Sequence, residues 1–303
     1  MAEDPVSTAT GGLLLVHAHP DDETITTGGT IARYRARGVP VTVVTCTLGE
    51  EGEVIGEQWA QLAADRADQL GGYRILELTR ALDALDAGPP RFLGGAGRWR
   101  DSGMAGTPSA EHPRAFVNSG PEAVEALVEV LLDLRPRVVV GYDPNGGYGH
   151  PDHIRAHRVT TEAVRAAAER GWDVPKFYWT VTDADMLRLH TEALARRTAA
   201  GLPGALPRGW RLPAADELAC VASDTVTTTV DVAEVLAAKR AALRAHATQI
   251  TVAPSGREFA LSNNIAQPVL PEEHYVLVRG RRGPAGPDGR EHDLFAGLDG
   301  PAT

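Results

Sequence analysis

The sequence predicts an α/β protein, built either as one large domain or as a domain with an appendage. Short continuous apolar runs, at 13–16 and 138–142, are typical of buried strands. Helical patterns follow such runs, which is the order expected of βαβ units and a parallel sheet. The chain has 303 residues, of which 43% are hydrophobic, so it can bury a substantial core.

The first βαβ unit occupies the N-terminal part of the chain. After the run at 13–16, a helix is expected at 28–38, where Gly38 supplies the C-terminal stop. The segment 39–47 is rich in β-branched residues and predicts the second strand. Cys46 lies inside this segment and is expected to be a buried thiol.

The rest of the chain continues to alternate between helical and extended patterns. Segment 57–70 predicts a helix whose apolar face includes Trp59. Segment 235–246 predicts another, with basic side chains such as Lys239 pointing outward. Further helices are expected at 121–134, 151–170 and 183–200, and further strands at 91–94, 137–142, 176–181, 224–232 and 274–279.

Charge and cysteine content argue against several classes of protein. The formal net charge of −10 disfavours a general nucleic-acid or anionic-membrane binder. No apolar run approaches the ~20 residues of a membrane-spanning helix, and the first twelve residues lack a signal-peptide pattern. Two cysteines do not indicate a disulfide framework, so a reducing cytoplasm is expected. The oligomeric state is unknown from the sequence.

A polar motif follows the first apolar run. His19, Asp21 and Asp22 lie at a predicted strand-to-helix corner, where open α/β sheets place their ligands. His19 and Asp22 could bind Zn²⁺, and Asp21 could be the general base for a water that the metal activates. Alone, the motif is equally compatible with a helix N-cap beside a surface histidine.

A second motif of the same kind follows the run at 138–142. It consists of His150, Pro151, Asp152 and His153. Two such corners at one edge of a sheet could supply a closed set of ligands. We prefer His153 to His157 as the ligand, because His153 lies in the first turn of its helix and mirrors Asp22. His157 is expected to pack against the site or to support it.

The predicted ligand set has three members, His19, Asp22 and His153. Three protein ligands leave a position open on the metal, as in catalytic zinc sites. Tyr148 and His150 carry donors suited to a developing oxyanion or a leaving amine. Asp152 could orient either His150 or a metal-binding histidine. These groups predict metal-assisted hydrolysis of an amide or ester.

A glycine-rich loop at 94–106 contains Trp99 and Asp101 together with two arginines. Such groups could hold a sugar, whereas the alternative is an ordinary flexible surface loop. The glycines do not form a G-x-G-x-x-G motif after a strand, and the chain has no Walker-type motif. Binding of a dinucleotide or a nucleotide phosphate is therefore poorly supported.

The two corners together resemble those of the zinc-dependent N-acetylglucosaminyl deacetylase superfamily, the LmbE-like or PIG-L-like group. Similar segments extend through the N-terminal half, and 239–249 is the best later match. The loop at 98–104 narrows the resemblance to the branch that acts in mycothiol biosynthesis. The resemblance implies a Rossmann-like, mostly parallel sheet with helices on both faces and a smaller C-terminal α+β appendage.

The resemblance also implies the activity and the ligands. The substrate would be 1-D-myo-inosityl-2-acetamido-2-deoxy-α-D-glucopyranoside, a small sugar-inositol molecule that would lose its N-acetyl group as acetate. One Zn²⁺ per subunit, or Fe²⁺ in the cell, would be held by the three predicted ligands. No nucleic acid or membrane partner is implied.

Individual roles follow from the same resemblance. Asp21 would be the general base, and Tyr148 would assist the oxyanion. His150 would be the general acid or would stabilise the tetrahedral intermediate. Arg74 and Asp101 match residues that the family uses on substrate hydroxyls.

These considerations predict three regions. Residues 1–182 would form the catalytic domain, 183–279 would form an appendage that helps to close the substrate pocket, and 280–303 would be a partly flexible tail.

Two rival functions remain. Mycothiol S-conjugate amidase would use the same metal corner and sugar-inositol core on a larger amide, but Gly149 and the Trp99 loop favour the deacetylase. A non-enzymatic metal- or sugar-binding module is less compatible with the sequence, because Asp21 supplies a base.

Overall fold

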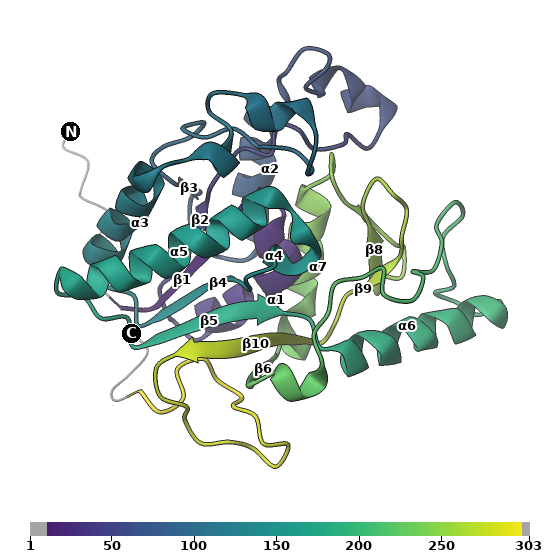
Figure 1. The fold of residues 1–303 in the computed structure, drawn as a ribbon. Coiled ribbons are helices and arrows are strands. Elements are labelled where there is room, and N and C mark those ends of the chain that lie inside the picture. The colour runs from purple at the N-terminus through teal and green to yellow at the C-terminus, as the bar shows by residue number, and fades with distance from the viewer. Residues whose placement is uncertain (1–10, 299–303) are drawn as a thin grey trace, which may run out of the picture.

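A central sheet of seven strands organises the structure, a computed structural model that describes residues 11–298 (Figure 1). Its strands are β1 (Leu13–His17), β2 (Val41–Thr45), β3 (Arg91–Phe92), β4 (Val138–Tyr142), β5 (Lys176–Val181), β6 (Thr228–Asp231) and β10 (Glu272–Arg279). Their order is β3-β2-β1-β4-β5-β10-β6. The neighbours from β3 to β5 are parallel, whereas β10 is antiparallel to β5 and β6.

Helices cover both faces of this sheet. They are α1 (Asp22–Ala36), α2 (Leu70–Ala84), α3 (Pro121–Leu134), α4 (Gly146–Gly149), α5 (Pro151–Glu169), α6 (Ala184–Ala199) and α7 (Leu236–Ala245). On β1, Leu14 packs in one core with α3 and α5, and Leu15 packs in the other with α1, α2 and α7. This alternation explains why the strand is apolar throughout. The predicted α/β fold with a mostly parallel sheet is confirmed.

The C-terminal region contributes to the same sheet. Strands β6 and β10 extend it beyond β5, so residue 182 does not mark a break in the sheet. A separate antiparallel sheet is formed by β7 (Thr251–Val252), β8 (Glu258–Ala260) and β9 (Gln267–Pro268). Helix α6 extends away from the central sheet near β9 (Figure 1).

One predicted helix was wrong. Segment 57–70 contains only a 3₁₀ helix, Glu57–Leu62, and α2 begins where the prediction ended. The true helix has buried apolar residues Leu78 and Leu82 four apart, a pattern that Gly71 and Gly72 obscure at its start. Gly71 is required there, because a Cβ would approach the Glu50 side chain to 2.7 Å.

Lys239 also differs from its prediction. Its side chain is buried, and Nζ donates to Glu273 Oε1 at 2.6 Å. The Glu273 carboxylate accepts the backbone N–H groups of Gly29 and Thr30 as well. The basic side chain points inward because a buried carboxylate requires a charged partner.

The predicted tail is described as far as residue 298, and 299–303 lie outside the described residues. Glu291 and Leu294 of this segment are fully buried. Lys176 Nζ donates to Glu291 Oε1 at 2.7 Å, and both side chains are inaccessible to solvent. The segment around Glu291 is therefore attached to β5.

We expect Lys176→Met to lower the free energy of unfolding by about 3–5 kcal/mol, because it leaves the Glu291 carboxylate buried without its charged partner. Denaturant unfolding measures this change. The double variant Lys176→Met/Glu291→Gln should recover part of the loss. A single-variant loss below about 1 kcal/mol would contradict the argument, since that is the scale of an exposed pair.

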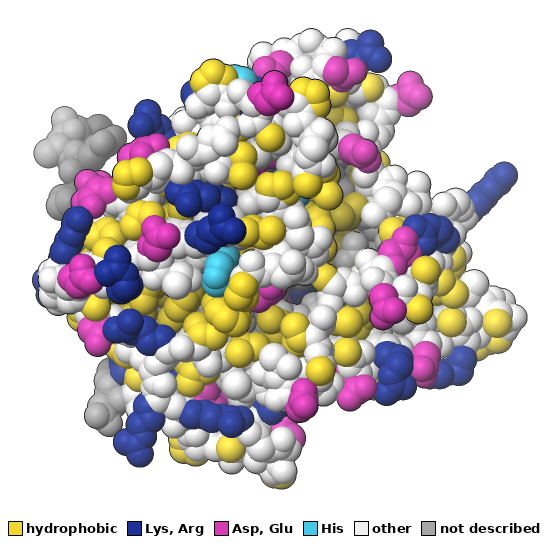
Figure 2. Space-filling view, in the orientation of Figure 1, with side chains coloured by type: hydrophobic (Ala, Val, Ile, Leu, Met, Phe, Trp, Pro, Cys, Tyr) yellow, Lys and Arg dark blue, Asp and Glu magenta, His cyan; other side chains and the backbone are white. Residues whose placement is uncertain are grey.

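The visible face carries acidic and basic side chains that are interspersed, without a broad basic area (Figure 2). Among the helices of residues 11–298, none combines the length and apolar character needed to cross a membrane.

Candidate functional site

The two polar corners meet at the point where the strand order reverses. β1 and β4 are parallel neighbours, so their C-terminal ends lie at the same edge of the sheet. β1 leads through His19 into α1, and β4 leads through the short α4 into α5. In open α/β sheets this switch point is where ligands bind.

The structure brings His19, Asp22 and His153 together. Asp22 Oδ2 lies 3.3 Å from His19 Nδ1 and 3.3 Å from His153 Nε2, and the two nitrogens are 3.3 Å apart. Tetrahedral bonds of about 2.0–2.1 Å to zinc separate ligand atoms by roughly 3.3–3.4 Å. The donor types and their spacing therefore fit a divalent ion with one face open.

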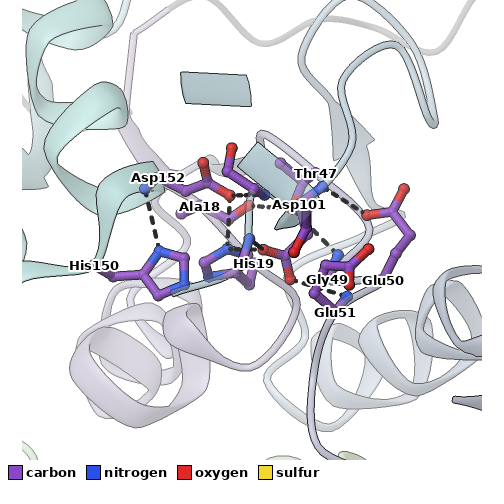
Figure 3. Close-up of polar contacts among 12 residues, drawn as sticks. Ala18, His19, Thr47, Gly49, Glu50, Glu51, Asp101, His150 and Asp152 are labelled. Carbon is purple, nitrogen blue, oxygen red and sulfur yellow. Dashed lines mark hydrogen bonds and ion pairs between the residues drawn. The ribbon is translucent and has the colours of Figure 1, made fainter. Parts of the chain in front are cut away.

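Contacts at the second ring nitrogen orient both histidines. His153 Nδ1 donates to the carbonyl of Gly146 at 3.1 Å. His19 Nε2 donates to Asp152 Oδ2 at 3.2 Å (Figure 3). Asp152 Oδ2 also accepts the N–H of Ser102. These bonds leave His19 Nδ1 and His153 Nε2 free as metal donors. Of the two histidines considered for Asp152, its carboxylate contacts His19.

Charge and burial shift the pKa values of the clustered side chains. Burial acts to lower the pKa of His19, but Asp101, Asp152 and Asp22 more than offset it, so the pKa is raised. Burial acts to raise the pKa of Asp22, whereas His153 and His19 hold it well below its usual range. The Asp22 carboxyl group is therefore ionised.

Asp21 lies beside this site in an unusual backbone conformation. Its φ is 123°, a region that is costly for any residue with a side chain, by about 1–3 kcal/mol. Burial raises the pKa of its carboxyl group to about 6, although Arg74 opposes the shift. A carboxylate with a pKa near neutrality is suited to act as a general base.

Arg74 is buried and holds the corner that carries Asp21. Its guanidinium lies 3.0 Å from Asp21 Oδ2 and donates to the carbonyls of Pro20 and Gly49. Both Arg74 and Asp101 line the cavity described below. Their contact with substrate hydroxyls stays a prediction.

His150 is neutral and presents a donor. Burial and the neighbouring His19 and His153 lower its pKa to about 3. Its Nδ1 accepts the N–H of Asp152 at 3.1 Å, so the ring proton resides on Nε2. A group with this pKa is better suited to hydrogen-bond an oxyanion than to donate a proton as a general acid.

Tyr148 is 57% exposed on α4. Its ring centre lies 5.0 Å from that of His153 and 6.0 Å from that of His150. Partial burial, together with the nearby Asp22 carboxylate, raises the pKa of Tyr148, so the hydroxyl is protonated at neutral pH and can donate.

Two further predictions about single residues can be compared with the structure. His157 Nδ1 donates to the carbonyl of Tyr142 at 2.8 Å and its ring packs against Trp179, in agreement with a packing role. Cys46 is buried, as predicted.

Tyr142 contacts the candidate site, although the sequence does not predict it as a site residue. Its hydroxyl donates to Asp22 Oδ2 at 2.8 Å and accepts the N–H of Ala18, and its ring stacks on His153. The residue ends β4, and the sequence predicts it only as part of that strand. Its one available signal was its place immediately before the second corner.

We expect Tyr142→Phe to weaken zinc binding by about 10–100-fold, because Asp22 loses the hydrogen bond that orients it. Competition with a chromogenic chelator measures this affinity. Tyr34→Phe removes an equally buried hydroxyl far from the donor set and serves as the control. Unchanged affinity in Tyr142→Phe would show that Asp22 needs no such support.

A cavity of about 670 Å³ opens above the donor set. It is lined by both corners and by the loop around Asp101. Residues 217–221 and parts of 259–274 also line it. Residues before 182 and residues of segment 183–279 thus line one cavity.

Comparison with known proteins places this geometry in context. The family model described as GlcNAc-PI de-N-acetylase (PIG-L) matches residues 14–164. A protein of Rhodococcus opacus named 1D-myo-inositol 2-acetamido-2-deoxy-alpha-D-glucopyranoside deacetylase is 64% identical over 296 residues, which cover 94% of this chain and 98% of that protein. A protein of the same name from Mycolicibacterium smegmatis is 62% identical, over 95% of this chain and 97% of its own.

The fold also occurs in a solved structure with another name. The chain is similar to the 4-carboxy-2-hydroxymuconate hydratase GalB of Pseudomonas putida KT2440, with a TM-score of 0.56 and 18% identity, over 91% of this chain and 100% of that one. At this identity the likeness concerns the fold alone.

Proposed function

The chain belongs to the PIG-L family of GlcNAc-PI de-N-acetylases, and we propose that it removes the N-acetyl group from 1-D-myo-inosityl-2-acetamido-2-deoxy-α-D-glucopyranoside in mycothiol biosynthesis. The observation that carries this proposal is the near-complete coverage of relatives with that name, at 62–64% identity, together with the open three-donor site. The products are acetate and the free amine.

We propose Zn²⁺ as the metal, with Fe²⁺ as the alternative in the cell. The donor atoms of two imidazoles and one carboxylate lie 3.3 Å from one another. This set suits a metal ion that is neither hard nor soft and that prefers tetrahedral coordination. When bound, such an ion polarises the amide carbonyl and lowers the pKa of water.

The residues of the chain supply the proton transfers. Asp21 takes the proton of the attacking water, for which its pKa of about 6 is suited. His150 Nε2–H and the Tyr148 hydroxyl donate to the carbonyl oxygen as it becomes negative. Asp21 then returns its proton to the leaving amine, so that the carboxylate is regenerated. The neutral state of His150 favours Asp21 over His150 as the acid.

We propose that Arg74 and Asp101 contact substrate hydroxyls and that segment 183–279 closes the pocket. The support is that both side chains and residues 217–221 line one cavity. The compartment proposed is the reducing cytoplasm, because Cys46 and Cys220 are both free thiols.

The decisive experiment measures acetate release from the N-acetylated sugar-inositol by the purified zinc-loaded chain. A bimane conjugate of mycothiol is the second substrate, because it carries the same core on a larger amide. Faster release from the N-acetyl compound supports the deacetylase, and faster cleavage of the conjugate would identify an amidase. If the chain binds zinc but hydrolyses neither amide, it is a non-enzymatic binding protein.

A further inference from the structure

The backbone of Asp21 is held by a side chain two residues away. The Asp21 N–H donates to Glu23 Oε2 at 2.9 Å. This bond fixes the peptide at the point where φ is 123°, a conformation that persists only where the surroundings impose it. The direction of the Asp21 carboxylate therefore depends on the position of the Glu23 carboxylate.

Glu23 is in turn held by a residue from the C-terminal region. Its side chain is fully buried. Its second oxygen, Oε1, accepts the hydroxyl of Thr24 at 2.5 Å and Nε2–H of His246 at 2.8 Å. His246 is also fully buried, and within residues 11–298 it is the one basic side chain that the structure places in contact with the Glu23 carboxylate.

His246 follows directly after α7, in a turn that is itself anchored. Thr248 of this turn donates its N–H and its hydroxyl to Glu77 of α2, at 2.8 and 2.7 Å. Helix α2 also carries Arg74, which binds the Asp21 carboxylate. Asp21 is thus held at its backbone through His246 and at its side chain through Arg74.

We propose that His246 is a positioning residue of the reaction: by holding Glu23, it fixes the backbone of Asp21 in the conformation that directs its carboxylate into the active site. This proposal rests on the assignment of Asp21 as general base. His246 touches none of the three donor atoms, so its effect should fall on the base and not on the metal.

Two amide substitutions test the contact. In His246→Gln the side-chain N–H₂ occupies the place of Nε2 and can still donate to Glu23. In His246→Asn the amide occupies the place of Nδ1, which has no partner in residues 11–298. Neither amide is charged, so the pair isolates the hydrogen bond.

We expect His246→Asn to lower kcat about 10²-fold, the scale of a misplaced reacting group. KM and bound zinc should stay at the wild-type level, and His246→Gln should recover most of kcat. The control is His292→Asn, because His292 pairs with Asp288 at the surface. Wild-type kcat in His246→Asn would overturn the proposal, and so would parallel losses of zinc and kcat that Gln does not rescue.

A double-mutant cycle asks whether His246 acts through Asp21. In an Asp21→Asn background, His246→Asn should cause little further loss of kcat, because the group it positions is already disabled. Independent, multiplicative losses would overturn the proposal.

Hydrogen exchange gives a reading that does not depend on activity. A peptide containing residues 19–25 should exchange faster in His246→Asn than in the wild type or in His246→Gln. If the wild-type chain releases no acetate, the proposed function fails, yet faster exchange would still support the control of this backbone by His246. Unchanged exchange would overturn it.

Discussion

Asp21→Asn should lower kcat for acetate release by about 10²–10⁴-fold, the usual contribution of a positioned general base. Asparagine keeps the size of the side chain, and its Oδ1 can still accept a hydrogen bond from Arg74, but it cannot take a proton from water. Because Asp21 is not among the three clustered donors, bound zinc should remain stoichiometric. Steady-state kinetics and metal analysis of the same preparation measure both quantities.

The matched control is Asp86→Asn. Asp86 is also an aspartate at positive φ beside an arginine, but its side chain is 82% exposed. It should retain wild-type kcat. If Asp21→Asn keeps more than about a tenth of the wild-type rate, proton abstraction belongs to another group.

His153→Ala should abolish both zinc binding and activity. The substitution removes one of three donor atoms, so the affinity should fall by more than the roughly 10–100-fold typical of losing a supporting contact. His19→Ala and Asp22→Ala should behave in the same way. Metal content after dialysis against a weak chelator, followed by activity with added zinc, measures the effect.

His157→Ala is the matched control on the same helix. His157 lies four residues further along α5 and contacts a backbone carbonyl and a tryptophan ring. We expect it to retain zinc. Stoichiometric zinc in His153→Ala, with loss of zinc in His157→Ala, would reverse the choice between the two histidines.

Several errors of sequence reasoning share a cause. Segment 57–70 was assigned a helix because its apolar residues have a helical period, yet the helix that packs on the sheet is α2, after it. Lys239 was placed outward because lysine is usually exposed, yet Glu273 pairs with it in the interior. Periodicity describes a segment by itself and does not identify the surface against which the segment packs.

The active-site support was hidden for a related reason. Tyr142 contacts Asp22, and Ser102 contacts Asp152. His246 contacts Glu23, which lies 223 positions earlier in the sequence. No local spacing relates such pairs. The resemblance to the deacetylase superfamily at 239–249 includes His246. It does not indicate which residues His246 contacts.

The amino-acid sequence by itself predicted the candidate donors and the candidate base, because His19, Asp21 and Asp22 lie within four positions at one strand end and His153 follows another. It also determined the alternation of buried strands and helices, since that depends on local apolar patterns. Only the tertiary structure decided that the C-terminal strands join the same sheet, and which distant side chains orient the donors and hold Asp21. Those contacts depend on how helices and strands pack across the chain, and packing is a property of surfaces brought together by folding.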